Sequence, residues 1–115
     1  MNKFFLTGRV GKLEATDGEY PKVSFSLVEK VRFKDSDGEW VEKNHWYWIQ
    51  SFNPILIENV QKAIAVGDLL NIEGSLEPWR KEDRAKKAFG LNLNLIAFER
   101  LHRPAQKEQA ADNSN

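Results

Sequence analysis

The most informative absence in this chain of 115 residues is that of cysteine. Without a thiol, the protein has no disulfide framework, no thiolate metal site and no cysteine nucleophile. Histidine is scarce as well, because the sequence contains only two, His45 and His102. A histidine-rich metal site is therefore not expected, and we predict neither a metal ion nor any other cofactor.

Long apolar runs are also missing. No stretch reaches the roughly eighteen apolar residues that a membrane span requires. The apolar stretch near the N-terminus is interrupted by the charge of Arg9, so it is too short for the apolar region of a signal peptide. We therefore expect a cytoplasmic protein. The length corresponds to one domain with one hydrophobic core.

The sequence carries no net charge, because its 17 basic residues are balanced by 17 acidic ones. An anionic partner must then be bound by local clusters of basic side chains rather than by the field of the whole molecule. Binding to single-stranded nucleic acid remains open, since much of its free energy comes from stacking of bases on aromatic rings.

Motifs for catalysis are absent. Gly8 and Gly11 do not open a helix, so they form no phosphate-binding loop. Residues 35–38 (DSDG) resemble the start of a calcium-binding loop, but Trp46 stands where the bidentate glutamate is required. No motif places a nucleophile beside His45, for which hydrogen bonding or packing is the favoured role. We therefore expect no enzyme.

The sequence does contain alternation of apolar and polar residues with a period of two, the pattern of half-buried strands. This alternation and the intervening turn signals predict strands over residues 3–13, 22–34, 39–52, 68–79 and 88–101. Between the third and fourth strands, Asn53 is a good N-cap and Pro54 a good first helical residue, so a short helix is predicted up to Gly67.

The order of these elements indicates a fold. Three strands, one helix and two strands is the order of the OB-fold, a barrel that binds oligonucleotides across its second and third strands and through neighbouring loops. We predict an all-β protein with one short helix, forming a five-stranded OB-fold barrel over residues 1–101. Residues 80–87 are expected to form a basic loop, and residues 102–115 a disordered polar tail.

The period also assigns side chains to faces of the strands. Residues expected to face inward are Val23, Phe25, Leu27, Leu70, Ile72, Gly74 and Leu76, while Tyr47 and Ile49 are expected in the core or at a subunit contact. In the last strand, an alternating apolar row is formed by Phe89, Leu91, Leu93, Leu95 and Ala97. Phe33 continues the inward phase of its strand unless a bulge intervenes.

The outward aromatic residues are the candidate binding site. Stacking of bases is predicted on Trp46, Trp48, Phe52 and Trp79, and phosphate contacts are predicted for Lys30, Arg32, Lys34, Arg80, Arg84, Lys86 and Lys87. The alternative is that these tryptophans belong to the core or to a protein interface, as aromatic residues commonly do. Aromatic and basic residues in register on the strands that an OB-fold uses for binding favour nucleic acid.

Several segments, in order and spacing, resemble the bacterial-type single-stranded DNA-binding protein (SSB) family. They are NKFFLTGRVGK near the start, VSFSLVEK in the second predicted strand, NHWYWIQSF in the third and VGDLLNIEGSLEPW before the basic loop. The resemblance implies an OB-fold that assembles, usually as a homotetramer, and binds single-stranded DNA. A dimer is the alternative assembly.

The resemblance also implies roles for individual residues. Trp46 and Phe52 fall on stacking positions of the family, and Trp79 lies near another. Phe33 lies close to the family's aromatic residue at the end of the second strand, so the resemblance implies stacking on Phe33 as well. Trp48 stands where the family often has a basic residue. The C-terminal AADNSN lacks the acidic tip through which the family recruits replication proteins, so that recruitment is not expected here. A short form carried by a bacterium, plasmid, phage or integrative element fits this ending.

Two functions therefore remain in view. The first is sequence-independent binding and protection of single-stranded DNA during replication, recombination or repair. The second is an accessory or replication-restart adaptor whose aromatic surface binds a protein partner. RNA remains open as the bound strand, because stacking alone does not exclude a 2′-hydroxyl.

Overall fold

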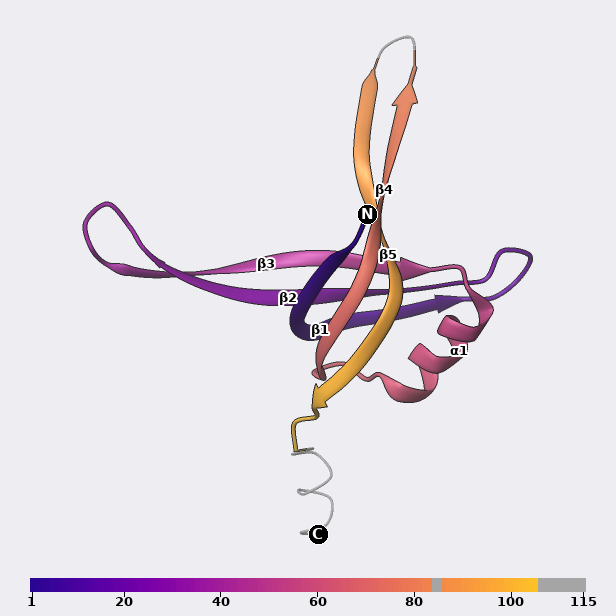
Figure 1. Ribbon diagram of the computed structural model, residues 1–115, viewed down its shortest axis with the longest axis horizontal. Helices are drawn as coiled ribbons and strands as arrows, with labels where there is room; N and C mark the ends of the chain where they lie inside the picture. Colours follow the sequence, from indigo (N-terminus) through magenta and orange to yellow (C-terminus); the bar gives the residue numbers. More distant parts are fainter. Residues whose placement is uncertain (84–85, 106–115) are drawn as a thin grey trace.

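The computed structural model describes residues 1–83 and 86–105 of the chain. Its elements are β1 (Phe4–Thr16), β2 (Lys22–Lys34), β3 (Trp40–Ser51), α1 (Pro54–Ala63), β4 (Leu69–Glu82) and β5 (Lys87–His102). The strands close into a barrel in the order β1-β2-β3-β5-β4, with α1 lying to one side (Figure 1). The prediction of an all-β barrel with one short helix is confirmed.

The core follows from the alternation in the strands. Val23, Phe25 and Leu27 of β2 are fully buried, as are Ile49 of β3 and Leu70 of β4. Burial of each such side chain contributes about 1.5–3 kcal/mol, so this inward row dominates the stability of the barrel. The inward assignments on β2, β3 and the first half of β4 are confirmed.

Strand β1 bends in the middle and closes the barrel. Its first half pairs with β4, its second half pairs with β2, and the register shifts between Val10 and Lys12. The extra residue at this bulge is Gly11. A bulge increases the local bend of a strand, which lets one strand belong to both walls of the barrel.

Helix α1 begins where predicted but ends earlier. The Asn53 side chain accepts hydrogen bonds from the backbone N–H groups of Ile55 and Leu56, as an N-cap does. The helix ends at Ala63 because Ile64 adopts extended angles and the Asp68 carboxylate accepts from the backbone N–H of Ala65 at 2.9 Å. The predicted continuation to Gly67 is therefore wrong, and the segment is a turn.

Two long hairpins extend beyond the barrel in different directions (Figure 1). The β2–β3 hairpin turns at residues 35–39, and the β4–β5 hairpin continues strand pairing out to Glu82 and Lys87. The radius of gyration is 17.6 Å, against about 13 Å for a compact domain of roughly 100 residues. The described part of the expected basic loop at 80–87 therefore consists mainly of the outer ends of β4 and β5.

The outer part of the β4–β5 hairpin exposes two apolar residues. Phe89 is 85% exposed and Leu91 is 54% exposed, although both belong to the alternating apolar row of the strand. Both keep the inward phase, but they lie on the part of the hairpin that has left the barrel, where no opposing wall covers them.

A bulge in β5 shifts the phase of the same row. Glu73 pairs with Ala97 while Gly74 pairs with Leu95, which leaves Ile96 as an extra residue. The inward phase shifts at this point, so Phe98 packs against the core and Ala97 is exposed. The buried phase of β5 therefore does not follow the apolar alternation of the sequence as far as Ala97.

The folded chain extends slightly beyond the predicted boundary at residue 101. His102 is the last residue of β5, and the Arg103 guanidinium forms an ion pair with Asp68 at 2.9 Å. The rest of the expected tail, residues 106–115, lies outside the described residues.

Candidate nucleic-acid interface

The outward face of the β2–β3 ribbon carries two of the predicted stacking residues. Trp46 pairs with Val28 and Trp48 pairs with Ser26, so both tryptophans share one face of the ribbon. Their side chains are 58% and 52% exposed, respectively. Neither tryptophan belongs to the core, and both rings are accessible to a ligand.

Trp46 is held by a glycine of a different strand. A Cβ placed on Gly11 would lie 2.7 Å from Cζ3 of Trp46 and 2.9 Å from Oγ of Ser26. The indole therefore reaches over β2 and lies close to the backbone of the β1 bulge. One side of the ring is supported and the other remains open.

Three predicted phosphate ligands continue this face toward the end of the hairpin. Lys34, Arg32 and Lys30 pair with Trp40, Glu42 and Asn44, respectively, in the same phase as Trp46. This arrangement places basic side chains and indoles in one row along the ribbon.

The structure separates Phe33 from this row. Phe33 pairs with Val41 and lies on the opposite face of the ribbon, with the Lys43 amine 5.5 Å from its ring centroid. Its side chain is 37% exposed. The inward phase of the strand thus continues to Phe33, and the residue does not share a surface with Trp46.

Phe52 lies at the other end of β3 and is 56% exposed. The amine of Lys22 lies 5.8 Å from its ring centroid. An aromatic ring with an adjacent cation is the combination that favours a nucleotide, since the ring can stack on the base while the cation approaches the phosphate.

A row of hydrogen-bonded polar side chains connects β3 with the β4–β5 hairpin. The Gln50 amide donates to Oδ1 of Asn94 at 3.1 Å, and the amides of Asn94 and Asn92 donate to Oε1 of Glu77 at 3.5 and 3.1 Å. Gln50 shares the phase of Trp48, and Glu77 shares that of Trp79. The outward surface is therefore continuous from the tryptophans of β3 to Trp79.

Trp79 repeats the arrangement of Trp46. It pairs directly with Gly90 across the hairpin, and a Cβ on Gly90 would lie 2.6 Å from Cζ2 of the indole. An aromatic ring that covers a cross-strand glycine is a known device for stabilising such a position in a sheet. Trp79 remains 42% exposed on its open side.

The basic residues of the β4–β5 hairpin are only partly grouped with Trp79. Arg80 pairs with Phe89 and Lys87 with Glu82, which places both basic residues on the face opposite Trp79, while Lys81 shares the face of Trp79. Lys86 lies in the turn, where its backbone bonds to Asp83. The predicted phosphate ligand Arg84 lies outside the described residues.

The reverse face of the β2–β3 ribbon carries a polar group near the barrel. The Tyr47 hydroxyl donates to Oε1 of Glu29 at 3.2 Å, and Nδ1 of His45 lies 3.4 Å from the same oxygen. Burial, and secondarily the hydrogen bond to Glu29, raises the pKa of Tyr47. His45 thus has a hydrogen-bonding environment rather than a nucleophile beside it.

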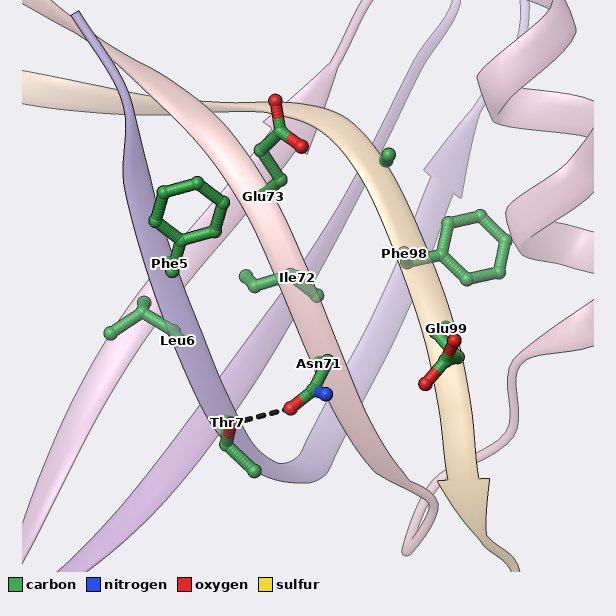
Figure 2. Close-up of a pocket in the computed structure, with 9 residues that line it drawn as sticks. Phe5, Leu6, Thr7, Asn71, Ile72, Glu73, Phe98 and Glu99 are labelled. Carbon is green, nitrogen blue, oxygen red and sulfur yellow. Dashed lines mark hydrogen bonds between the residues drawn. The ribbon is translucent and has the colours of Figure 1, made fainter.

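A hollow on the outer wall of β1, β4 and β5 carries no catalytic arrangement (Figure 2). Within it the Thr7 hydroxyl donates to Oδ1 of Asn71 at 2.5 Å, and the exposed ring of Phe5 lies beside Glu73. In the part of the chain that the structure describes, no group of three or more His, Asp or Glu side chains is arranged to hold a metal ion. No helix among the described residues is long and apolar enough to cross a membrane.

Comparison with known proteins agrees with this geometry. Residues 1–100 match the model of the single-strand binding protein family. This chain belongs to that family. A curated relative, the single-stranded DNA-binding protein of Aquifex aeolicus (strain VF5), is 28% identical over 117 residues, covering 97% of this chain and 78% of the relative.

Solved structures of similar fold confirm the OB-fold barrel. A Plasmodium falciparum SSB in complex with ssDNA superimposes with a TM-score of 0.72 at 21% identity, covering 89% of this chain and 96% of that one. The mitochondrial single-stranded DNA-binding protein Rim1 of S. cerevisiae gives a TM-score of 0.69 at 19% identity, over 89% and 96% of the two chains.

Sequence reasoning missed several members of the candidate surface. Lys22, which contacts Phe52, has the outward phase of β2, and that signal was sufficient to include it. Trp40 has the phase of Trp46 and was overlooked because it stands beside the turn. The supports at Gly11 and Gly90 depend on contacts between strands, and no local pattern in the sequence reveals them.

Proposed function

We propose that this protein binds single-stranded DNA with little sequence preference through the outward surface that joins the β2–β3 ribbon to the β4–β5 hairpin. The observation that carries the proposal is the continuity of that surface, on which open indole rings alternate with basic and amide side chains. Bases would stack on Trp46, Trp48, Phe52 and Trp79. Phosphates would be bound by Lys30, Arg32, Lys34 and Lys86, whereas Arg80 and Lys87 lie on the face opposite Trp79.

Stacking supplies most of the affinity in this proposal. Each base stacked on an aromatic side chain contributes roughly 1–3 kcal/mol, and such contacts tolerate every base. The chain has no net charge, so the electrostatic contribution is limited to the local cluster of cations. Membership of the single-strand binding protein family supports this function. Protection of single strands in replication, recombination or repair follows as the cellular role, in the cytoplasm and without catalysis.

The experiment is a titration of intrinsic tryptophan fluorescence with oligo(dT) at low and high salt, and then with duplex. We expect quenching by the single strand that persists at high salt, because stacking is not screened. Trp46→Ala should weaken binding by about 1–3 kcal/mol while the cooperative thermal melt is retained, since its ring lies outside the core. Equal quenching by duplex and single strand would contradict the proposal.

The adaptor function is the second candidate. The exposed apolar side chains of Phe89 and Leu91 on the β4–β5 hairpin favour it, because they offer a surface to a protein partner. A stable protein complex, together with undetectable quenching by oligo(dT), would favour the adaptor function over binding of single-stranded DNA.

We also propose that the protein acts as a homo-oligomer, with a tetramer favoured over a dimer. The family relationship supports assembly. The outer wall of β1, β4 and β5, where Phe5 is 71% exposed, offers area for contact away from the aromatic ribbon. Sedimentation equilibrium measures the assembly directly.

A further inference from the structure

The outer end of the β2–β3 ribbon carries an aromatic residue to which no role has been given so far. Trp40 is the first residue of β3 and its side chain is 62% exposed, more than that of Trp46 or Trp48. This end of the β2–β3 hairpin projects beyond the barrel (Figure 1), where core packing cannot account for a tryptophan.

The strand register places Trp40 on the candidate interface. Trp40 and Trp46 are six residues apart on one strand, so their side chains point to the same face. At roughly 3.3 Å per residue the two rings stand about 20 Å apart along β3. Phe33, at the same level of the hairpin, points to the opposite face.

Two cations accompany the ring. The guanidinium carbon of Arg32 lies 5.5 Å from the centroid of the Trp40 ring, and the amine of Lys34 lies 5.3 Å from it. Despite these contacts most of the ring remains accessible. A base that stacked on Trp40 would therefore bring its phosphate within reach of two positive charges.

Acidic residues lie near the turn and mark the end of this row. The Asp35 carboxylate accepts hydrogen bonds from the backbone N–H groups of Asp37 and Glu39, so it is engaged in forming the turn. Glu42 lies within the row, on the same face as Trp40 and opposite Arg32 across the ribbon. Beyond Trp40, the acidic residues at the turn (Asp35, Asp37 and Glu39) would repel a polyanion that follows the row of cations.

We propose that Trp40, with Arg32 and Lys34, is the last stacking platform of the single-strand surface, and that it takes the place which family resemblance assigns to Phe33. This inference rests on the proposed function. Its consequence is that the bound strand follows the β2–β3 ribbon outward from Trp46 to the turn.

The experiment measures affinity for oligo(dT) at lengths from about 4 to about 16 nucleotides, the range of site sizes on single OB-folds. For the unmodified protein, affinity should rise with length until the strand spans both Trp46 and Trp40. In Trp40→Ala, the affinity for the longer oligomers should fall by roughly 5-fold to 150-fold, so that the gain in affinity with length is lost. The affinity of this variant for the shortest oligomers should equal that of the unmodified protein. Trp40→Phe should retain most of the increment because it keeps an aromatic face.

Phe33→Ala is the matched control, since it removes an aromatic side chain at the same level of the hairpin from the other face. We expect its length dependence to equal that of the unmodified protein. Lys34→Gln should weaken binding of long oligomers at low salt, with the difference vanishing at high salt. Thermal melts and circular dichroism of all variants establish that the barrel is intact.

The outcomes are distinguishable. If Trp46→Ala weakens binding while Trp40→Ala matches the unmodified protein at every length, the inference is wrong and the proposed function stands. Loss of the increment in Phe33→Ala rather than Trp40→Ala would likewise overturn the inference. If the unmodified protein fails to bind oligo(dT) of any length, the proposed function itself fails.

Discussion

Single glycines set the orientation of two tryptophans on the candidate surface. Gly11 lies beneath Trp46 and Gly90 lies beneath Trp79, each so close that a methyl group would collide with the indole. In both pairs the absent side chain is what allows the ring to lie against the backbone. A ring held in this way has lost much of its rotational freedom before any base arrives, which lowers the entropic cost of binding.

The variant Gly11→Ala tests this support. Its Cβ would lie 2.7 Å from the Trp46 ring, so the ring must shift, and we expect affinity for oligo(dT) to fall by no more than the about 1–3 kcal/mol of Trp46→Ala. The effects should not add, and Gly11→Ala in a Trp46→Ala background should cause no further loss of binding. An equal loss in both backgrounds would mean that Gly11 acts through the β1 bulge instead.

At this scale, the position of a side chain can be predicted from the sequence when it depends only on the residues of its own strand. The faces of Trp46 and Phe25 depend only on the period of their own strands, and both were predicted correctly. The supports beneath the indoles depend on which strands become neighbours, so they could not be predicted. Phe33 was assigned from resemblance alone, whereas the register places it on the other face.

At the scale of elements, the two hairpins divide the molecule into a barrel and two projecting ribbons. The period of two continues without interruption from Leu95 and Leu93 in the barrel to Leu91 and Phe89 in the β4–β5 hairpin. The sequence pattern therefore does not show where the barrel ends, because all four residues belong to one alternating apolar row. The bulge at Ile96 was equally invisible, because it is defined by the pairing with β4.

Substitutions at the two ends of this row should have different energetic effects. Phe89→Ala should change the free energy of unfolding by no more than about 0.5 kcal/mol, since the side chain is 85% exposed. Leu95→Ala should cost about 2–5 kcal/mol, since Leu95 is 5% exposed and packs in the core. Urea unfolding of both variants measures the difference. A destabilisation by Phe89→Ala comparable to that by Leu95→Ala would mean that another surface covers the hairpin.

At the scale of the whole molecule, one buried ion pair ties the segment after β5 to the barrel. Asp68 is fully buried, and its carboxylate accepts from Nε and Nη2 of Arg103, both at 2.9 Å. Arg103 also donates to the carbonyl of Ala63, and the Asp68 carbonyl accepts from the backbone N–H of Val10. The segment after β5, the turn after α1 and the middle of β1 are thereby joined.

This ion pair predicts a dependence of stability on pH. Hydrogen bonds from Arg103 hold the pKa of Asp68 below its usual range, against the opposing effect of burial. A lowered pKa in the folded state stabilises the fold at pH values above the unfolded pKa of about 3.9, and this contribution is lost as the pH falls through the folded value.

Asp68→Asn should therefore lower the melting temperature at pH 7 and reduce the loss of stability on acidification below about pH 4. Thermal melts from pH 7 to pH 3 measure both effects. Glu58→Gln is the matched control, because Glu58 pairs with Lys62 at an exposed site where such a pair contributes little. Parallel pH profiles for Asp68→Asn and the unmodified protein would contradict the assignment.

The glycine-supported rings have a consequence for the form of DNA that the protein can bind. Because the backbone occupies one side of each indole, a base can approach Trp46 or Trp79 only from the solvent side. Contacts made in this way form and break one at a time, and no part of the strand has to be threaded through the protein. A covalently closed circle, which has no terminus to offer, is then as good a ligand as a linear strand of the same length.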